Sequence, residues 1–215
     1  MADPTWLRRG AHGVLRGGTT ATWSVAEGTR GRRWREIRRE AGSIVATLLE
    51  VDAAGRWTRL EMASGAGLLT LHPDATERSV DGNVVSPDGV RHHAVGWTPE
   101  HRLILPGSVV GQAALAAVLT DRVGVGEVLH VPGLAVDSRL HVDEVVIEVE
   151  RPGVDRWHLS IAGEPPDHVV VDGDGWPIVA DAMQWPLETE LEMGTPVDAV
   201  WTRSARSAGS FETRG

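Results

Sequence analysis

LPGSVVGQAALAAVLTDR, residues 105–122, is the stretch that decides the fold, because it is the one run whose pattern predicts a helix. Residues 104–119 include no charged side chain, and the only polar ones are Ser108 and Gln112. Ser108 follows a Pro-Gly pair and is suited to cap the helix N-terminus. A helix that is apolar nearly all round must be buried on most of its faces. We therefore predict a buried helix over about residues 108–120.

The rest of the chain reads as short strands separated by turns. The hairpin at 51–62 is the clearest, with a turn at Asp52-Ala53-Ala54-Gly55 followed by an alternating strand. That alternation places Leu60 and Met62 on one face and Trp57 on the other. Turn signals recur about every eight to twelve residues, as in an antiparallel meander. We predict a mainly β fold: a curved antiparallel sheet or partly open β-barrel of about ten strands with one inserted buried helix.

Two further patterns bear on this architecture. Residues 51–57 and 171–176 share the order strand, Asp turn, Gly, Trp, which either a duplicated half or a recurring hairpin turn would produce; we favour the turn. With 215 residues the chain is long enough for a sizeable core. We expect one β domain over 1–201, followed by a small, polar, flexible tail at 202–215.

The cationic run RGRRWREIRRE at 30–40 allows both a helix and a strand. Trp34 and Ile37 fit a helical face, but glycines bracket the run, so we favour a strand that pairs with 43–51. Its six arginines could form an anion-recognition strip for a carboxylate or phosphate. We favour instead a solvated edge strand whose charges discourage edge-to-edge pairing.

Composition excludes several classes of function. The chain has no Cys, which rules out disulfides and thiolate chemistry, and its net charge of -9 argues against a nucleic-acid partner. The start MADPTWLRRG lacks the apolar core of a signal peptide, and the segment 104–120 is too short for a membrane span. Phosphate-cradling motifs are absent, so we expect no cofactor. The sequence predicts a cytoplasmic protein of undetermined oligomeric state.

The histidines are the first candidates for chemistry, since imidazole titrates near neutral pH. His92, His93 and Glu100 lie close together in sequence and are our catalytic candidates if the protein is an enzyme. On a strand the two histidines point to opposite faces, and no HExxH or HxH spacing occurs, so we predict no metal site. There is no GxSxG elbow either, and Ser108 is better explained as a cap than as a nucleophile.

The tryptophans suggest a different role. Seven of them fall on or beside the expected strands, where they could simply fill the core or could line an apolar cavity. For the set as a whole we favour a cavity lined by two or three indoles. The ligand-contacting candidates are four wall residues and two helix residues that would close the pocket: Trp57, Leu60, Met62, Trp97, Leu115 and Val118.

The segments VDAAGRWTRLEM (51–62), LLTLHPD (68–74), SVDGNVV (79–85) and HRLILPGS (101–108) together resemble a family of glycolipid-binding proteins. That family is related in fold to bacterial lipoprotein carriers, so the resemblance implies an unclosed antiparallel half-barrel with a helical lid over an apolar concave face. This chain has no lipidation cysteine, which puts lipoprotein traffic in doubt. Only the interior apolar side chains carry over as a class.

We therefore expect the protein to bind an apolar small molecule or lipid in a Trp-rich cavity. The alternative is a cofactor-independent enzyme, such as a cyclase or isomerase, that uses the same cavity for a hydrophobic metabolite. A His–carboxylate pair opening onto the cavity would favour the enzyme. A third interpretation, a filled core with a partner-binding surface, requires a solid interior.

Overall fold

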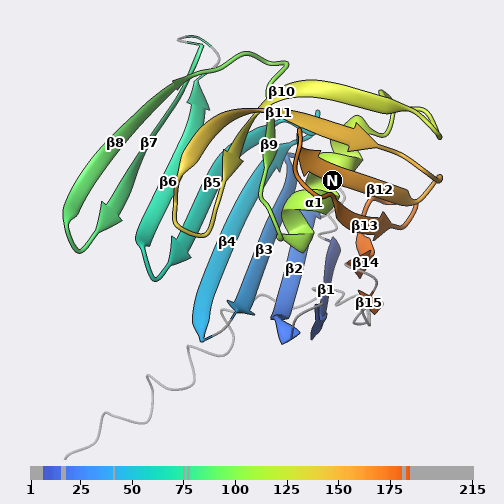
Figure 1. The fold of residues 1–215 in the computed structure, drawn as a ribbon, viewed down its shortest axis with the longest axis horizontal. Helices are drawn as coiled ribbons and strands as arrows, with labels where there is room; N and C mark the ends of the chain where they lie inside the picture. Colours follow the sequence, from blue (N-terminus) through green and yellow to red (C-terminus); the bar gives the residue numbers. More distant parts are fainter. Residues whose placement is uncertain are drawn as a thin grey trace, which may run out of the picture.

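The computed structural model describes residues 7–15, 18–40, 42–74, 76, 78–180 and 183–184. Over these residues the protein has fifteen strands and one α-helix, arranged as two β-sheets with the helix between them (Figure 1). The mainly β, antiparallel architecture with one helix is as predicted. The number of strands is larger than the ten expected, because segments such as 7–14, 102–104 and 128–136 form strands that the sequence pattern did not predict. The expected tail at 202–215 lies outside the described residues.

The first sheet is an eight-stranded antiparallel meander in which each strand pairs with the next along the chain. Its strands are β1 (Leu7–Val14), β2 (Thr20–Gly28), β3 (Gly31–Glu40), β4 (Ser43–Asp52), β5 (Trp57–Ser64), β6 (Gly67–Asp74), β7 (Ser79–Ser86) and β8 (Gly89–Gly96). The cationic run at 30–40 is therefore a strand, as predicted, and it pairs with the segment expected. It is not an edge strand, since β3 lies between β2 and β4 and buries Trp34 and Glu36 on its inner face.

The second sheet has seven strands and arches over the helix (Figure 1). Its strands are β9 (Arg102–Ile104), β10 (Val128–Val136), β11 (Val142–Glu150), β12 (Arg156–Ile161), β13 (Asp167–Val171), β14 (Pro177–Ala180) and β15 (Met183–Gln184). All neighbouring pairs are antiparallel except β9 and β10, which run parallel. A parallel pair needs a long crossover, and the segment that contains the helix supplies it.

The helix, α1 (Val109–Leu119), occupies the predicted position, and nine of its eleven residues are buried. Ser108 is the N-cap, and its hydroxyl accepts a hydrogen bond from the Gly111 N–H. The helix packs against β3 of the first sheet and against β9, β13 and β14 of the second. The two sheets therefore bury the apolar surface of the helix. No helix within the described residues is long and apolar enough to cross a membrane.

A buried carboxylate ties the start of α1 to the first sheet. Glu36 of β3 accepts hydrogen bonds from the Ser108 hydroxyl at 2.7 Å and from the Val109 N–H at 2.8 Å. The Arg38 guanidinium lies 3.5 Å away. Burial raises the pKa of Glu36, against the opposing effects of Arg38 and these hydrogen bonds. On the other side, Asp167 accepts from the Gly107 N–H at 2.8 Å, so both sheets hold the helix N-terminus.

The two segments that echo each other in sequence form the same turn. In each, an Asp side chain, Asp52 or Asp172, accepts hydrogen bonds from the backbone N–H groups two and four residues later. The third residue after each Asp, Gly55 or Gly175, has a positive φ. The same hydrogen bonds recur at Asp137, outside the echo, which supports turn chemistry as the common cause.

A β-bulge overturns one prediction about the first sheet. Val51 pairs with Trp57 and Glu50 pairs with Arg59, so Thr58 is an extra residue in β5. An extra residue shifts the alternation by one. Trp57 therefore faces inward together with Leu60, and not outward as simple alternation predicted.

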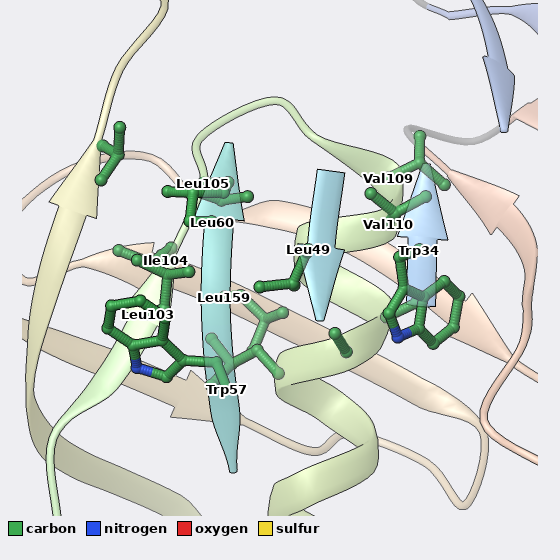
Figure 2. Packing of buried hydrophobic residues seen from close by; sticks show 14 of the residues in the cluster. Trp34, Leu49, Trp57, Leu60, Leu103, Ile104, Leu105, Val109, Val110 and Leu159 are labelled. Carbon is green, nitrogen blue, oxygen red and sulfur yellow. The ribbon is translucent and has the colours of Figure 1, made fainter. Parts of the chain in front are cut away.

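The buried apolar residues of both sheets and of α1 form one cluster. Figure 2 shows Trp34 of β3, Leu49 of β4 and Trp57 of β5 in this cluster with Val110 of α1 and Leu159 of β12. The helix is thus enclosed by apolar side chains of both sheets.

Candidate functional site

An apolar cavity of about 230 Å³ lies beside α1, bounded by β4, β5 and the segment that connects β8 to β9. Its walls come from both sheets and the helix. Its large apolar lining side chains include Leu49, Trp57, Trp97, Leu103, Leu115 and Val118. Side chains of the first sheet, the second sheet and α1 meet here because the helix lies between the two sheets.

Two tryptophans form one wall of the cavity. The rings of Trp57 and Trp97 meet edge to face, with centroids 5.0 Å apart and an interplanar angle of 86°. This is a favoured geometry for an aromatic pair. The bulge at Thr58 turns Trp57 into the interior, and a hydrogen bond from the Trp97 N–H to the Arg78 carbonyl fixes the start of the β8–β9 connection. The pair therefore presents rigid apolar surface to the cavity.

An ion pair occupies one side of the cavity rim. Asp52 accepts from the Arg56 guanidinium at 2.9 Å and 2.7 Å, and its other oxygen accepts from the N–H groups of Ala54 and Arg56. Partial burial acts to raise the pKa of Asp52, but the hydrogen bonds from Arg56 and Ala54 outweigh it and hold the pKa below its ordinary value. Asp52 is thus an ionised, fully engaged turn residue.

His101 also borders the cavity, with its ring against Trp97. The two rings are 5.3 Å apart. The Nδ1 atom of His101 accepts a hydrogen bond from the Thr98 N–H at 3.0 Å and lies 2.8 Å from the Thr98 hydroxyl. Because Nδ1 is the acceptor, the neutral ring carries its proton on Nε2. Among the described residues, no carboxylate is hydrogen-bonded to this imidazole.

Arg102 is the remaining charged residue of the lining. One terminal nitrogen, Nη1, donates to the carbonyls of Pro99 and His101 at 2.8 Å and 2.9 Å. Its Nε is buried and has no hydrogen-bond partner within the described part of the chain. Burial lowers the pKa of Arg102, and repulsion from Arg122 adds to this against the attraction of Glu100. Arg102 is therefore a guanidinium whose second edge is unused.

Four of the six ligand-contacting candidates surround this cavity: Trp57, Trp97, Leu115 and Val118. The other two, Leu60 and Met62, are almost fully buried in the core and do not line it. They lie farther along β5, beyond the stretch that borders the cavity.

The catalytic candidates lie elsewhere. His92 and Glu100 are exposed, His93 is half-buried on β8, and none of the three lines the cavity. Burial and then Arg91 lower the pKa of His93. The His–carboxylate pairs found among the described residues are His130–Glu148, His141–Asp137 and His158–Glu150, and none of these borders the cavity. Nor do the described residues bring together three His, Asp or Glu side chains that could hold a metal ion.

A second hollow, of about 500 Å³, lies by the C-terminal end of α1, between the turns at Asp52 and Asp174. It is larger than the first cavity, but its lining is mainly polar. Most of its charged groups are already paired, since Arg32 lies 3.2 Å from Glu27, Asp52 lies 2.7 Å from Arg56 and Asp174 lies 3.4 Å from Arg9. The apolar cavity is therefore the better candidate for a ligand site, despite its smaller volume.

Sequence reasoning missed several lining residues, notably Leu49, Leu103, His101 and Arg102. Leu49 carries a signal, because it shares the apolar face of a predicted strand. His101 and Arg102 carry none, since nothing in the sequence places the β8–β9 connection against α1 and β5.

The fold and the cavity define this protein as a mainly β protein with two sheets that enclose one helix and an apolar pocket beside it. No protein-family model matches the chain, and no curated protein matches it in sequence. Among solved structures it is similar to the crystal structure of a DUF1089 family protein from Pseudomonas aeruginosa, with 14% identity and a TM-score of 0.48. The similarity covers 85% of this chain and 93% of the other.

Proposed function

We propose that this protein binds an apolar small molecule, or the end of a lipid chain, in the cavity between β4, β5 and α1. The observation that carries the proposal is the wall itself: an edge-to-face Trp57–Trp97 pair opposite Leu115 and Val118 of the helix. Ligand pockets are mostly apolar with a few polar anchors, which matches this lining.

The volume limits the ligand. Ligand pockets commonly span about 300–1,000 Å³, and this cavity has about 230 Å³. A compact molecule, or one short acyl segment of a larger lipid, fits that volume. A whole lipid would have to extend beyond the rim.

The enzyme alternative requires a polar group that can move a proton inside the cavity. A His–carboxylate pair would supply one, but the nitrogen of His101 that could be oriented by a carboxylate faces Thr98 instead. His92, His93 and Glu100 do not reach the lining. Binding is therefore the function that we favour over catalysis.

The test is a calorimetric titration with 1-octanol, a neutral apolar probe. We expect saturable binding with a negative heat-capacity change, the signature of apolar burial. Val118→Trp places an indole in the cavity from a half-buried helix position and should weaken binding at least tenfold. Val128→Trp makes the same change at an exposed position of β10, away from the cavity, and should leave binding unchanged.

Two results would contradict the proposal. The wild-type protein could show no saturable binding, or Val118→Trp could bind 1-octanol as well as Val128→Trp does. Native mass spectrometry of the purified protein would in addition reveal a molecule carried from the host cell.

A further inference from the structure

We infer that the ligand is an amphipathic carboxylic acid whose head group binds to Arg102 and His101 at the rim while its apolar body fills the cavity. This inference rests on the proposed function and goes beyond it, since it assigns the ligand a charge and assigns that charge to named residues. Three features of the rim carry it: an unused guanidinium edge, an oriented imidazole donor and an unbalanced positive charge.

The first feature is the free edge of Arg102. Its Nη1 is occupied by the carbonyls of Pro99 and His101, which anchor the side chain and leave the Nε–Nη2 edge without a partner in the described structure. A guanidinium presents two parallel N–H groups on this edge, matching the two oxygens of a carboxylate. Nε is shielded from solvent, so the side chain must rotate slightly for a carboxylate to reach both nitrogens.

The second feature is the orientation of His101. Its Nδ1 accepts from the Thr98 N–H, so the neutral ring carries its proton on Nε2, which has no hydrogen-bond partner among the residues that the structure describes. The ring lies against Trp97 and borders the same cavity as Arg102. His101 therefore offers a hydrogen-bond donor, and not an acceptor, to a group at the rim.

The third feature is the charge of the lining. The cavity has three charged residues, Asp52, Arg56 and Arg102. Asp52 is neutralised by Arg56 at 2.7 Å, whereas no carboxylate within the described residues lies within ion-pair distance of Arg102. The lining thus has an excess of one positive charge in a protein whose net charge is -9. Glu100 attracts Arg102 only from beyond ion-pair distance, so an anionic ligand would supply the direct counter-ion that the half-buried guanidinium lacks among the described residues.

The experiment compares octanoate with 1-octanol, which have the same chain length and differ in the head group. We expect wild-type protein to bind octanoate at least tenfold more tightly, since hydrogen bonds to charged groups contribute about 1.5–3 kcal/mol. Arg102→Met keeps the apolar stem and should reduce the preference for octanoate over 1-octanol to less than twofold. Arg102→Lys keeps the charge without the fork and should retain part of the preference.

The control is Arg35→Met, which removes the same charge from an exposed position on the outer face of β3. It should leave both affinities unchanged. If Arg102→Met fails to fold, the wild-type comparison and Arg102→Lys still decide the question.

The outcomes separate this inference from the proposed function. If 1-octanol binds and octanoate binds no more tightly, the inference is wrong and the apolar site stands. If neither probe binds, the proposed function itself is wrong. If octanoate is preferred but Arg102→Met preserves the preference, the head group does not lie on Arg102 and the inference is again wrong.

Discussion

Replacing Glu36 with Ala should lower the free energy of unfolding by about 3–5 kcal/mol, the loss typical of removing one partner from a buried charged pair. The structure supports this magnitude. The substitution leaves the Ser108 hydroxyl and the Val109 N–H buried without their acceptor and removes the negative charge beside Arg38. Each unsatisfied buried donor costs about 1–3 kcal/mol. Both donors belong to the start of α1, so the helix should loosen from β3.

Equilibrium urea unfolding, followed by tryptophan fluorescence, measures this loss, because Trp34 and its neighbours in the core become exposed. Glu50→Ala is the matched control: Glu50 pairs with Arg33 at the surface, and an exposed pair contributes about 0–1 kcal/mol. If Glu36→Ala lowered the free energy of unfolding by no more than Glu50→Ala does, Glu36 would not be the anchor of the helix.

The same residue predicts a pH dependence. Burial raises the pKa of Glu36 above its ordinary value of 4.5. Below pH 4.5 the side chain is protonated in both the folded and the unfolded state. Above pH 4.5, the unfolded chain releases the proton before the folded protein does. The wild-type protein therefore loses stability as pH rises from 4.5 to the raised pKa. Above the raised pKa, this loss of stability no longer changes with pH.

Glu36→Gln cannot titrate at this position, so its stability relative to the wild type should increase over that interval. Unfolding of both proteins in urea between pH 4.5 and pH 8 measures the difference, and the titration of all other groups cancels. If the wild type instead became more stable relative to Glu36→Gln as pH rises, Arg38 and the helix donors would outweigh the effect of burial on the pKa of Glu36.

Two further predictions concern residues with positive φ. Gly55→Ala should lower the melting temperature more than Gly163→Ala. Both substitutions place a side chain at a φ near +80°, which destabilises the fold by about 1–2 kcal/mol. Only at Gly55 does the new Cβ also meet a neighbour, Val118 at 3.0 Å. Leu140→Gly should be more stable to urea than Leu140→Ala, in reverse of the usual order, because φ is +66° there; the opposite ranking would show that Leu140 is not strained.

Local signals in the sequence predicted much of this fold. Most of the uncharged run at 104–119 is the buried helix α1, because its apolar faces are poorly suited to water, and Ser108 caps it as expected. The run at 30–40 is a strand because its glycines stop a helix from forming. The Asp and Gly residues at 52–55 predicted the turn there. The same turn at Asp137 has Leu140 in place of the glycine, so the sequence pattern does not reveal it.

The candidate site was predictable only in part. Trp57, Trp97, Leu115 and Val118 could be selected because large apolar side chains must be buried somewhere, and all four lie around one cavity. His92, His93 and Glu100 were selected by proximity along the chain, which says nothing about proximity in space. The bulge in β5 was also invisible, since it arises from the pairing of β5 with β4.

By itself, the sequence determined most of the strands, the one helix and the tight turns at Asp52 and Asp172, because hydrogen bonds and side-chain patterns within a few residues decide these features. Only the tertiary structure decided the two-sheet arrangement, the inward rotation of Trp57 and the meeting of His101 and Arg102 with the apolar wall. Those features depend on contacts between residues far apart in the chain, and a single sequence carries no direct record of such contacts.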